Sequence, residues 1–169
     1  MDIALALLLA RLIGIGLAAH GAQKLFGWFG GYGLAGTGGF FETLGFKPGI
    51  LFAASAGVGE VAGGLLIALG LGGPLGPMLI IAAMTVAIIA VHLPNGFFAQ
   101  KNGYELALAY LVLAFVFAFT GFGAYSLDAT FGLAGFWTPT IAWIAVAVGI
   151  LVGLANVAIR RKPSAQPTT

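Results

Sequence analysis

The chain has 169 residues, of which 60% are hydrophobic and only 7% are charged. Soluble domains carry about 25% charged residues, so this composition excludes an ordinary water-soluble globule, and its hydrophobicity excludes a disordered chain. Seven Lys and Arg against five Asp and Glu give a net charge of +2, too small to indicate a nucleic-acid partner. The composition predicts a protein whose partner is the lipid bilayer.

Five apolar stretches predict five transmembrane helices, because each is close to the ~20 residues that cross about 30 Å of hydrocarbon. The stretches lack the alternation of apolar and polar residues that is typical of membrane strands. We therefore predict an all-α fold, a polytopic membrane helical bundle. In chain order the stretches cover residues 3–26, 50–71, 75–93, 104–122 and 139–159.

The connection at residues 27–49 is rich in glycine and aromatic residues. Aromatic side chains at this density are typical of the headgroup level of a membrane. The piece at 39–44 is a candidate interfacial helix in which Phe40, Phe41 and Leu44 enter lipid. The alternative, an irregular loop, stays open.

The basic residues outside the apolar stretches fall on one side of this topology. A basic cluster follows the fifth stretch directly, so the C-terminus is expected in the cytoplasm and the N-terminus outside a multi-pass plasma-membrane protein. The outer segments contain Asp2 and Asp128 and no Lys or Arg. The cations expected near the inner side are Lys24, Lys47, Lys101, Arg160, Arg161 and Lys162.

Arg11 and Glu60 are charged residues inside the first two predicted helices. Ionisable groups are costly in hydrocarbon and are functional candidates by default. Counted from the outer helix ends, Arg11 lies about 12 Å deep and Glu60 about 16 Å deep, at ~1.5 Å per residue. The residues leave two interpretations open: a structural ion pair between Arg11 and Glu60, or a proton or substrate site at Glu60.

A second polar group gathers at the inner ends of the first and third predicted helices. His20 and Lys24 lie one turn apart on a shared face, and His92 lies near the end of the third helix. Snorkelling explains a lysine at this level but explains two histidines less well. The candidate ligand-binding residues are His20, Gln23, Lys24, His92, Asn95 and Glu105.

Such a pocket suits a quinone headgroup, whose carbonyl oxygens need hydrogen-bond donors and whose tail needs an apolar path. His20, His92 and Lys24 are the expected donors. Haem is not favoured, because nothing in the spacing requires two opposed axial histidines. No metal site is expected, and the chain has no cysteine, so redox chemistry would need a bound cofactor or a partner protein.

Small residues recur every four positions in the second helix, at Ser55, Gly59 and Gly63. Stripes of this kind predict close packing between membrane helices. A homo-oligomer stays open as well, because five helices with glycine stripes leave helix faces free.

Several motifs together resemble the DoxX family. Residues 11–27, RLIGIGLAAHGAQKLFG, are similar to the family's opening helix, and residues 59–64, GEVAGG, are similar to its second helix. HLPNGFF, GYE and YSLD, which begin at His92, Gly103 and Tyr125, extend the resemblance to about residues 5–132. It implies a four-helix membrane domain at 1–132, related to the membrane subunit of a thiosulfate:quinone oxidoreductase. Another member is associated with an oxidoreductase complex of redox-stress defence.

This chain departs from the family pattern in two ways. Its N-terminus is not basic, and an additional helix at 133–159 precedes a polar tail at 160–169 that is expected to be mobile. The leading hypothesis is a redox-associated membrane protein that binds a quinone or similar lipophilic ligand and acts with a partner oxidoreductase. A small proton-coupled transporter using Glu60, and a scaffold or assembly factor, are the alternatives. Whether the chain is itself catalytic stays open.

Overall fold

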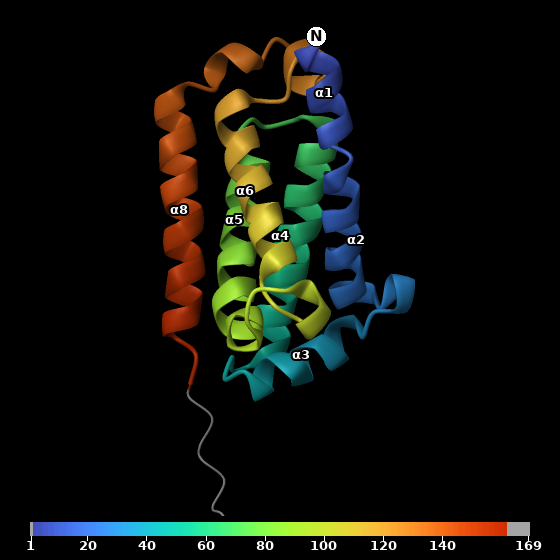
Figure 1. Cartoon of the computed structure of the whole chain (residues 1–169), viewed down its shortest axis with the longest axis vertical. Helices are drawn as coiled ribbons and strands as arrows, with labels where there is room; N and C mark the ends of the chain where they lie inside the picture. The colour runs from blue at the N-terminus through green and yellow to red at the C-terminus, as the bar shows by residue number, and fades with distance from the viewer. Residues whose placement is uncertain (1, 162–169) are drawn as a thin grey trace, which may run out of the picture.

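A computed structural model describes residues 2–161, and these form an all-helical, elongated bundle (Figure 1). The long helical segments, called rods below, run in alternating directions along the chain, so residue 2 and residue 161 lie at opposite ends of the bundle. The predicted all-α membrane bundle is confirmed. Lys162 and the rest of the polar tail lie outside the described residues.

Four rods are long and apolar enough to cross a membrane, and the fourth rod in chain order, α6, is shorter with 16 residues. Each rod begins and ends close to its predicted stretch. The rods are α1 (Ile3–Ala10) continued by α2 (Ile13–Phe26), α4 (Gly49–Leu69), α5 (Leu75–Ala87) continued by η2 (Ile88–His92) and η3 (Leu93–Asn95), α6 (Glu105–Thr120) and α8 (Pro139–Ala158).

Short helices fill the connections. Most of the connection at 27–49 is helical: α3 begins well before residue 39 and lies across the end of α4 (Figure 1). Its Phe41 is buried against Phe46 and Ala53 instead of entering lipid, because α3 covers the end of the bundle core. The short elements are η1 (Trp28–Gly30), α3 (Gly33–Thr43), η4 (Ala99–Lys101), α7 (Leu127–Thr130) and η5 (Ala134–Phe136).

Glycines bring α2 and α4 into backbone contact. A Cβ atom built on Gly21 would lie 2.5 Å from the carbonyl oxygen of Gly57, and one built on Gly64 would lie 2.5 Å from the carbonyl oxygen of Gly14. Real Cβ atoms do not approach so closely, so a larger residue would require a helix to move. These two glycine pairs therefore set the antiparallel register of α2 against α4.

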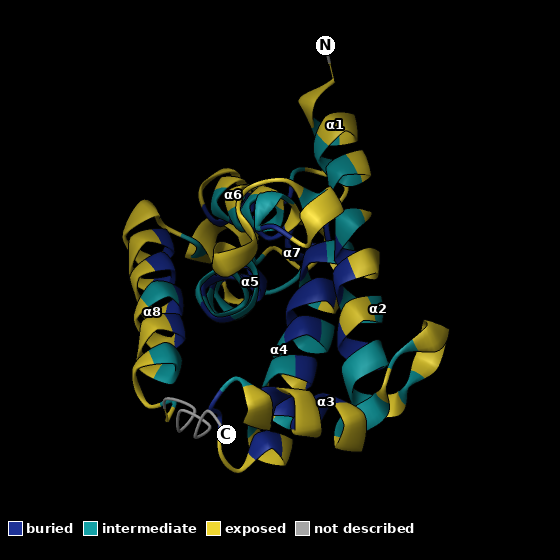
Figure 2. Ribbon diagram, turned by 60° about the horizontal axis from the view of Figure 1, so that its bottom comes forward, coloured by how far each residue is buried: buried dark blue, intermediate teal, exposed yellow. Residues whose placement is uncertain are grey.

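The C-terminal helix α8 packs on α5 through a similar contact. A Cβ atom on Gly153 would lie 2.6 Å from Cβ of Thr85, and one on Gly149 would lie 2.7 Å from the carbonyl oxygen of Met78. Figure 2 shows buried residues on the inward side of α8 and exposed residues on its outward side. The outward side carries large apolar residues such as Trp143, which suit contact with lipid tails.

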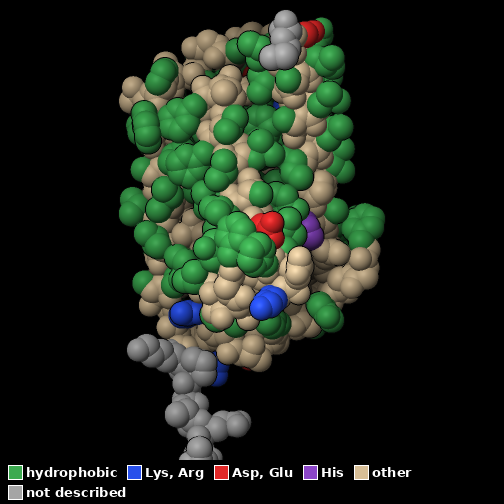
Figure 3. All heavy atoms as spheres, viewed as in Figure 1, with side chains coloured by type: hydrophobic (Ala, Val, Ile, Leu, Met, Phe, Trp, Pro, Cys, Tyr) green, Lys and Arg blue, Asp and Glu red, His purple; other side chains and the backbone are tan. Residues whose placement is uncertain are grey.

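Charged side chains are unevenly distributed between the two ends of the bundle. Figure 3 shows basic side chains gathered at the lower end, where the loops carry Lys47, Lys101 and Arg161. Asp2 and Asp128 belong to the opposite end. Most of the surface between the ends is apolar in this view.

Candidate functional site

A cavity of about 720 Å³ lies at the end of the bundle that α3 covers. Residues of α2, α3, α4, α5, η2 and α8 form its walls. Ligand pockets commonly measure about 300–1,000 Å³, so this cavity has room for a substituted ring and part of an apolar tail. Aromatic residues form much of the apolar lining, namely Tyr32, Phe40, Phe41, Phe46 and Phe52.

Lys24 of α2 and Glu60 of α4 form an ion pair in the cavity wall. Glu60 is buried, with 4% of its surface exposed, and the Lys24 ammonium donates a hydrogen bond to its Oε2. The Lys24 side chain is 26% exposed. The hydroxyl of Thr37, on α3, donates to the backbone carbonyl of Lys24 at 3.4 Å and connects the three helices.

The expected pair between Arg11 and Glu60 does not form. The register set by the glycine pairs places Glu60 level with about residue 18 of α2, roughly 10 Å along the axis from Arg11 at 1.5 Å per residue. Helical side chains tilt toward the N-terminus of their own helix. In the antiparallel pair, Lys24 and Glu60 therefore lean toward each other, whereas Arg11 leans away from Glu60.

Arg11 is buried at the other end of the bundle, with 2% of its surface exposed. Its Nη2 donates to the carbonyl oxygen of Tyr125 at 2.7 Å, and its Nη1 lies against Gly70, the residue that ends α4. The Nε and Nη1 atoms have no hydrogen-bond partner within residues 2–161. Arg11 thus connects the break between α1 and α2 to the segment after α6, and it does not line the cavity.

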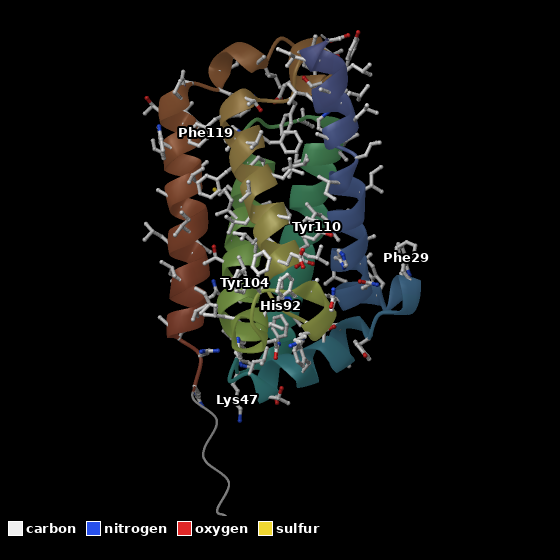
Figure 4. All side chains as sticks on the ribbon, viewed as in Figure 1. Phe29, Lys47, His92, Tyr104, Tyr110 and Phe119 are labelled. Atoms are coloured by element: carbon white, nitrogen blue, oxygen red, sulfur yellow. The ribbon has the colours of Figure 1, made fainter. Side chains whose placement is uncertain are left out.

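His20 lines the cavity and belongs to a short chain of hydrogen bonds. Its Nδ1 lies 3.0 Å from Oε1 of Gln23, and Nε2 of Gln23 donates to the carbonyl oxygen of Phe29 at 3.2 Å. Phe29 itself projects away from the bundle (Figure 4). The His20 ring also lies near Tyr110 of α6, with ring centroids 6.4 Å apart.

His92 lines the same cavity from the end of the π-helical turn η2. Its Nδ1 lies 2.8 Å from the carbonyl oxygen of Asn102, in the loop before α6. Figure 4 shows His92 and Tyr104 at the lower end of the bundle. The fold therefore brings His20, Gln23, Lys24 and His92 to one cavity.

Asn95 and Glu105, the other two predicted residues, are not among the lining residues. The Asn95 side chain donates to the carbonyl oxygens of Val91 and Asn102, and Glu105 accepts a hydrogen bond from the backbone N–H of Ala99. Both side chains stabilise the loop between η3 and α6, because they bond backbone groups that would otherwise lack hydrogen-bond partners.

Several lining residues were not predicted from the sequence. The α3 aromatics were assigned to the membrane surface, and Thr37 of α3 and Asn156 of α8 were not considered. A lone amide in an apolar helix was the available signal for Asn156, since polar residues in membrane helices usually face the bundle interior. Its Nδ2 donates to the carbonyl oxygen of Val152, one turn earlier.

Known proteins resemble part of this chain. Over 79 residues, 45% of this chain, it is 39% identical to an uncharacterized protein of Haemophilus influenzae, and the match covers 59% of that relative. No solved structure matches the chain. The DoxX family matches residues 6–93, more than half of the chain, and this segment contains His20, Lys24, Glu60 and His92. The chain belongs to the DoxX family of membrane proteins.

Proposed function

We propose that the chain binds a quinone, or another lipophilic ring with polar substituents, and acts as the membrane subunit of a redox system. One observation carries the proposal: a cavity of about 720 Å³ combines an aromatic, apolar lining with a polar wall of Lys24, Glu60 and two histidines. The apolar lining suits a ring and its tail. The polar wall suits oxygen substituents, which need hydrogen-bond partners when they leave water.

Lys24 is the residue of this wall that suits a carbonyl oxygen. Its ammonium group has three donors, and one of them is used by Glu60. The partly exposed side chain leaves the other donors available to a ligand. A hydrogen bond from a charged donor is stronger than one between neutral groups, so Lys24 would contribute most to holding an oxidised ring.

We further propose that a partner oxidoreductase exchanges electrons with the bound ring. The chain has no cysteine and therefore no thiolate-held iron–sulfur cluster of its own. The family's association with a thiosulfate:quinone oxidoreductase subunit supports this arrangement. The Lys24–Glu60 pair favours binding over proton transport, because the two charges neutralise each other and leave no unpaired carboxylate to carry a proton.

Filling the cavity tests the binding role. Gly59 lines the cavity, and a Cβ atom built on it would meet nothing within 4 Å. Gly59→Leu should therefore place a side chain in the cavity and lower the quinone that co-purifies with the protein several-fold, as measured by lipid extraction and mass spectrometry. Gly16→Leu is the matched control, because Gly16 is a helical glycine with the same open surroundings that does not line the cavity.

Equal quinone in both variants and in the unmodified protein would contradict the proposal, and so would its absence from all three after gentle extraction. If the extracted ligand is not a quinone, the proposed ligand becomes that other lipophilic molecule. Thermal unfolding in detergent should be similar for the two variants, since neither leucine meets an existing atom at its Cβ.

We also propose that the end carrying the cavity faces the cytoplasm of a plasma membrane. The support is the gathering of Lys47, Lys101 and Arg161 at that end, while the other end has the loop and terminal residues Asp2 and Asp128. A reporter active only outside the membrane should stay silent when it is fused to the C-terminus, and active when it is fused to the N-terminus. The reverse pattern would invert the orientation.

A further inference from the structure

The hydrogen-bond chain at His20 has a fixed direction. The carbonyl oxygen of Phe29 can only accept, so the amide nitrogen of Gln23 must face it and the Gln23 oxygen must face His20. Nδ1 of His20 therefore carries the hydrogen that bonds this oxygen. A neutral imidazole has one N–H group, so its Nε2 is left as an acceptor.

His92 has the same tautomer as His20, but a different hydrogen-bond partner determines it. The carbonyl oxygen of Asn102 can only accept, so the Nδ1 atom of His92 carries the hydrogen in the 2.8 Å contact. Neutral His92 then also presents Nε2 as an acceptor. The Nε2 atoms of both rings are without a protein partner within residues 2–161, and both residues line the cavity.

These tautomers change the role that the two rings would have toward a ligand. The sequence predicted that His20 and His92 donate to the carbonyl oxygens of a quinone. Each ring instead uses its N–H group on the protein. Glu60 adds a further acceptor, since its Oε2 is bonded to Lys24 and its Oε1 has no partner among the described residues. Lys24 then supplies a charged donor, whereas His20, His92 and Glu60 supply acceptors.

Building on the proposed function, we propose that the cavity selects the reduced, hydroxyl-bearing form of its ring over the oxidised form. Two hydroxyl groups of a hydroquinone can donate to imidazole Nε2 atoms or to the Glu60 carboxylate. The carbonyl oxygens of a quinone can only accept, and they meet unpaired acceptors on the histidines. Placing two acceptors together without a hydrogen leaves both unsatisfied, which is costly at the half-buried His92, and also at the exposed His20 where lipid instead of water surrounds the ring.

The test measures the binding of three ring compounds to the full-length protein in detergent micelles under argon, at about pH 8, where an ordinary imidazole is neutral. The compounds are a short-tailed benzoquinone, the matching hydroquinone and the dimethyl ether of that hydroquinone, which keeps the shape but has no hydroxyl donors. Titration calorimetry gives the three dissociation constants. The hydroquinone should bind tighter than either other compound by about 2- to 12-fold for each hydrogen bond gained.

The variants His20→Leu and His92→Leu should each lower the affinity for the hydroquinone by a similar factor and leave the affinity for the quinone nearly unchanged. Thr43→Val is the matched control, because Thr43 is a polar side chain at the same end of the bundle that is not a lining residue and whose hydroxyl donates to the backbone carbonyl of Phe40. It should leave all three affinities unchanged. Each variant's thermal unfolding is measured first, so that only folded proteins are compared.

The outcomes separate this inference from the proposed function. A quinone that binds as tightly as its hydroquinone, or tighter, would overturn the selectivity and leave the binding role intact. Histidine variants that bind the hydroquinone as well as the unmodified protein would overturn it too. Failure of all three compounds to bind would overturn both the selectivity and the quinone-binding function.

Discussion

The two ends of the bundle use buried polar residues for different purposes. At the end with the N-terminus, Arg11 donates to a backbone carbonyl, and Asp128 accepts from the backbone N–H groups of Gly72 and Gly73 at 2.9 and 2.7 Å. At the other end, Lys24 and two histidines line a cavity. At the first end, backbone groups contact the charged side chains, whereas at the second end a cavity lies beside them.

This contrast refines a general expectation about membrane proteins. A charged residue in hydrocarbon is a functional candidate because its burial is costly. Arg11 is buried like Glu60, yet it contacts the backbone at Tyr125 and Gly70 and does not line the cavity. The presence of a cavity beside the charge, and not the charge alone, separates a candidate binding site from a structural connection.

The largest expected effect belongs to the Lys24–Glu60 pair. Lys24→Met leaves a buried carboxylate without its cation, and such a loss costs ~3–5 kcal/mol in a protein interior. Adding Glu60→Gln removes the unpaired charge and should restore part of the stability. Thermal unfolding in detergent of the two single variants and the double variant measures this coupling.

The same cycle with Arg11 sharpens the comparison. Arg11→Met and Glu60→Gln should change stability additively, within about 0.5 kcal/mol, because the two side chains share no contact. A coupling as large as that of Lys24 with Glu60 would mean that the two ends are not independent. It would also restore the ion pair that was predicted from the sequence.

A smaller effect is expected where Gly70 meets Arg11. Gly70 has a left-handed backbone with φ of 65°, and a Cβ atom on it would overlap Nη1 of Arg11. Gly70→Ala should cost about 2–4 kcal/mol, as the sum of backbone strain and overpacking. Gly132→Ala is the control, since Gly132 has φ of 69° and open space around its Cβ position.

The control should lose only about 1–2 kcal/mol, the cost of the left-handed backbone. Denaturation of both variants under identical conditions gives the difference, which is the contribution of the Arg11 contact. Equal losses would show that Arg11 moves aside freely and that this end is not closed around it.

The smallest effect is expected for Asp128→Asn. The amide keeps one acceptor oxygen but loses the charge and the second acceptor, so the turn between α4 and α5 should lose about 1–2 kcal/mol. Asp2→Asn is the control, because Asp2 also accepts from backbone N–H groups but is exposed, and asparagine is an equally good helix cap.

Ligand binding should be unchanged in both aspartate variants, because neither residue lines the cavity. Co-purifying quinone measured beside thermal unfolding tests this separation. A fall in quinone content for Asp128→Asn with the stability preserved would show that the end with the N-terminus controls the cavity.

The bundle could be predicted from the sequence because hydropathy and helix length are local properties. The partner of Glu60 could not be predicted by counting depth from helix ends. The register depends on where two backbones touch, and the contacts lie at Gly14, Gly21, Gly57 and Gly64. The predicted stripe included Gly63, which packs against α5, and Gly59, which opens to the cavity.

The part of the candidate site that follows from helix topology could be predicted from the sequence. Antiparallel helices bring the end of the first rod and the end of the third to one level, and that places His20 and His92 at the same end of the bundle. The aromatic wall depends on how α3 folds across the end of α4. That packing involves residues with no helical periodicity strong enough to reveal which side faces inward, since Phe40 is exposed and the adjacent Phe41 is buried.

The position of His92 also depends on the geometry of the helix that carries it, because a π-helical turn spans Ile88–His92. A π turn holds one residue more than an α turn, so the phase of α5 shifts there. If the same residues formed a regular α-helix instead, His92 would be rotated by up to about 100° around the axis. Its imidazole would then leave the cavity although every side chain named in the site remained in the protein. The spacing of this helix is therefore as much a part of the site as its chemistry.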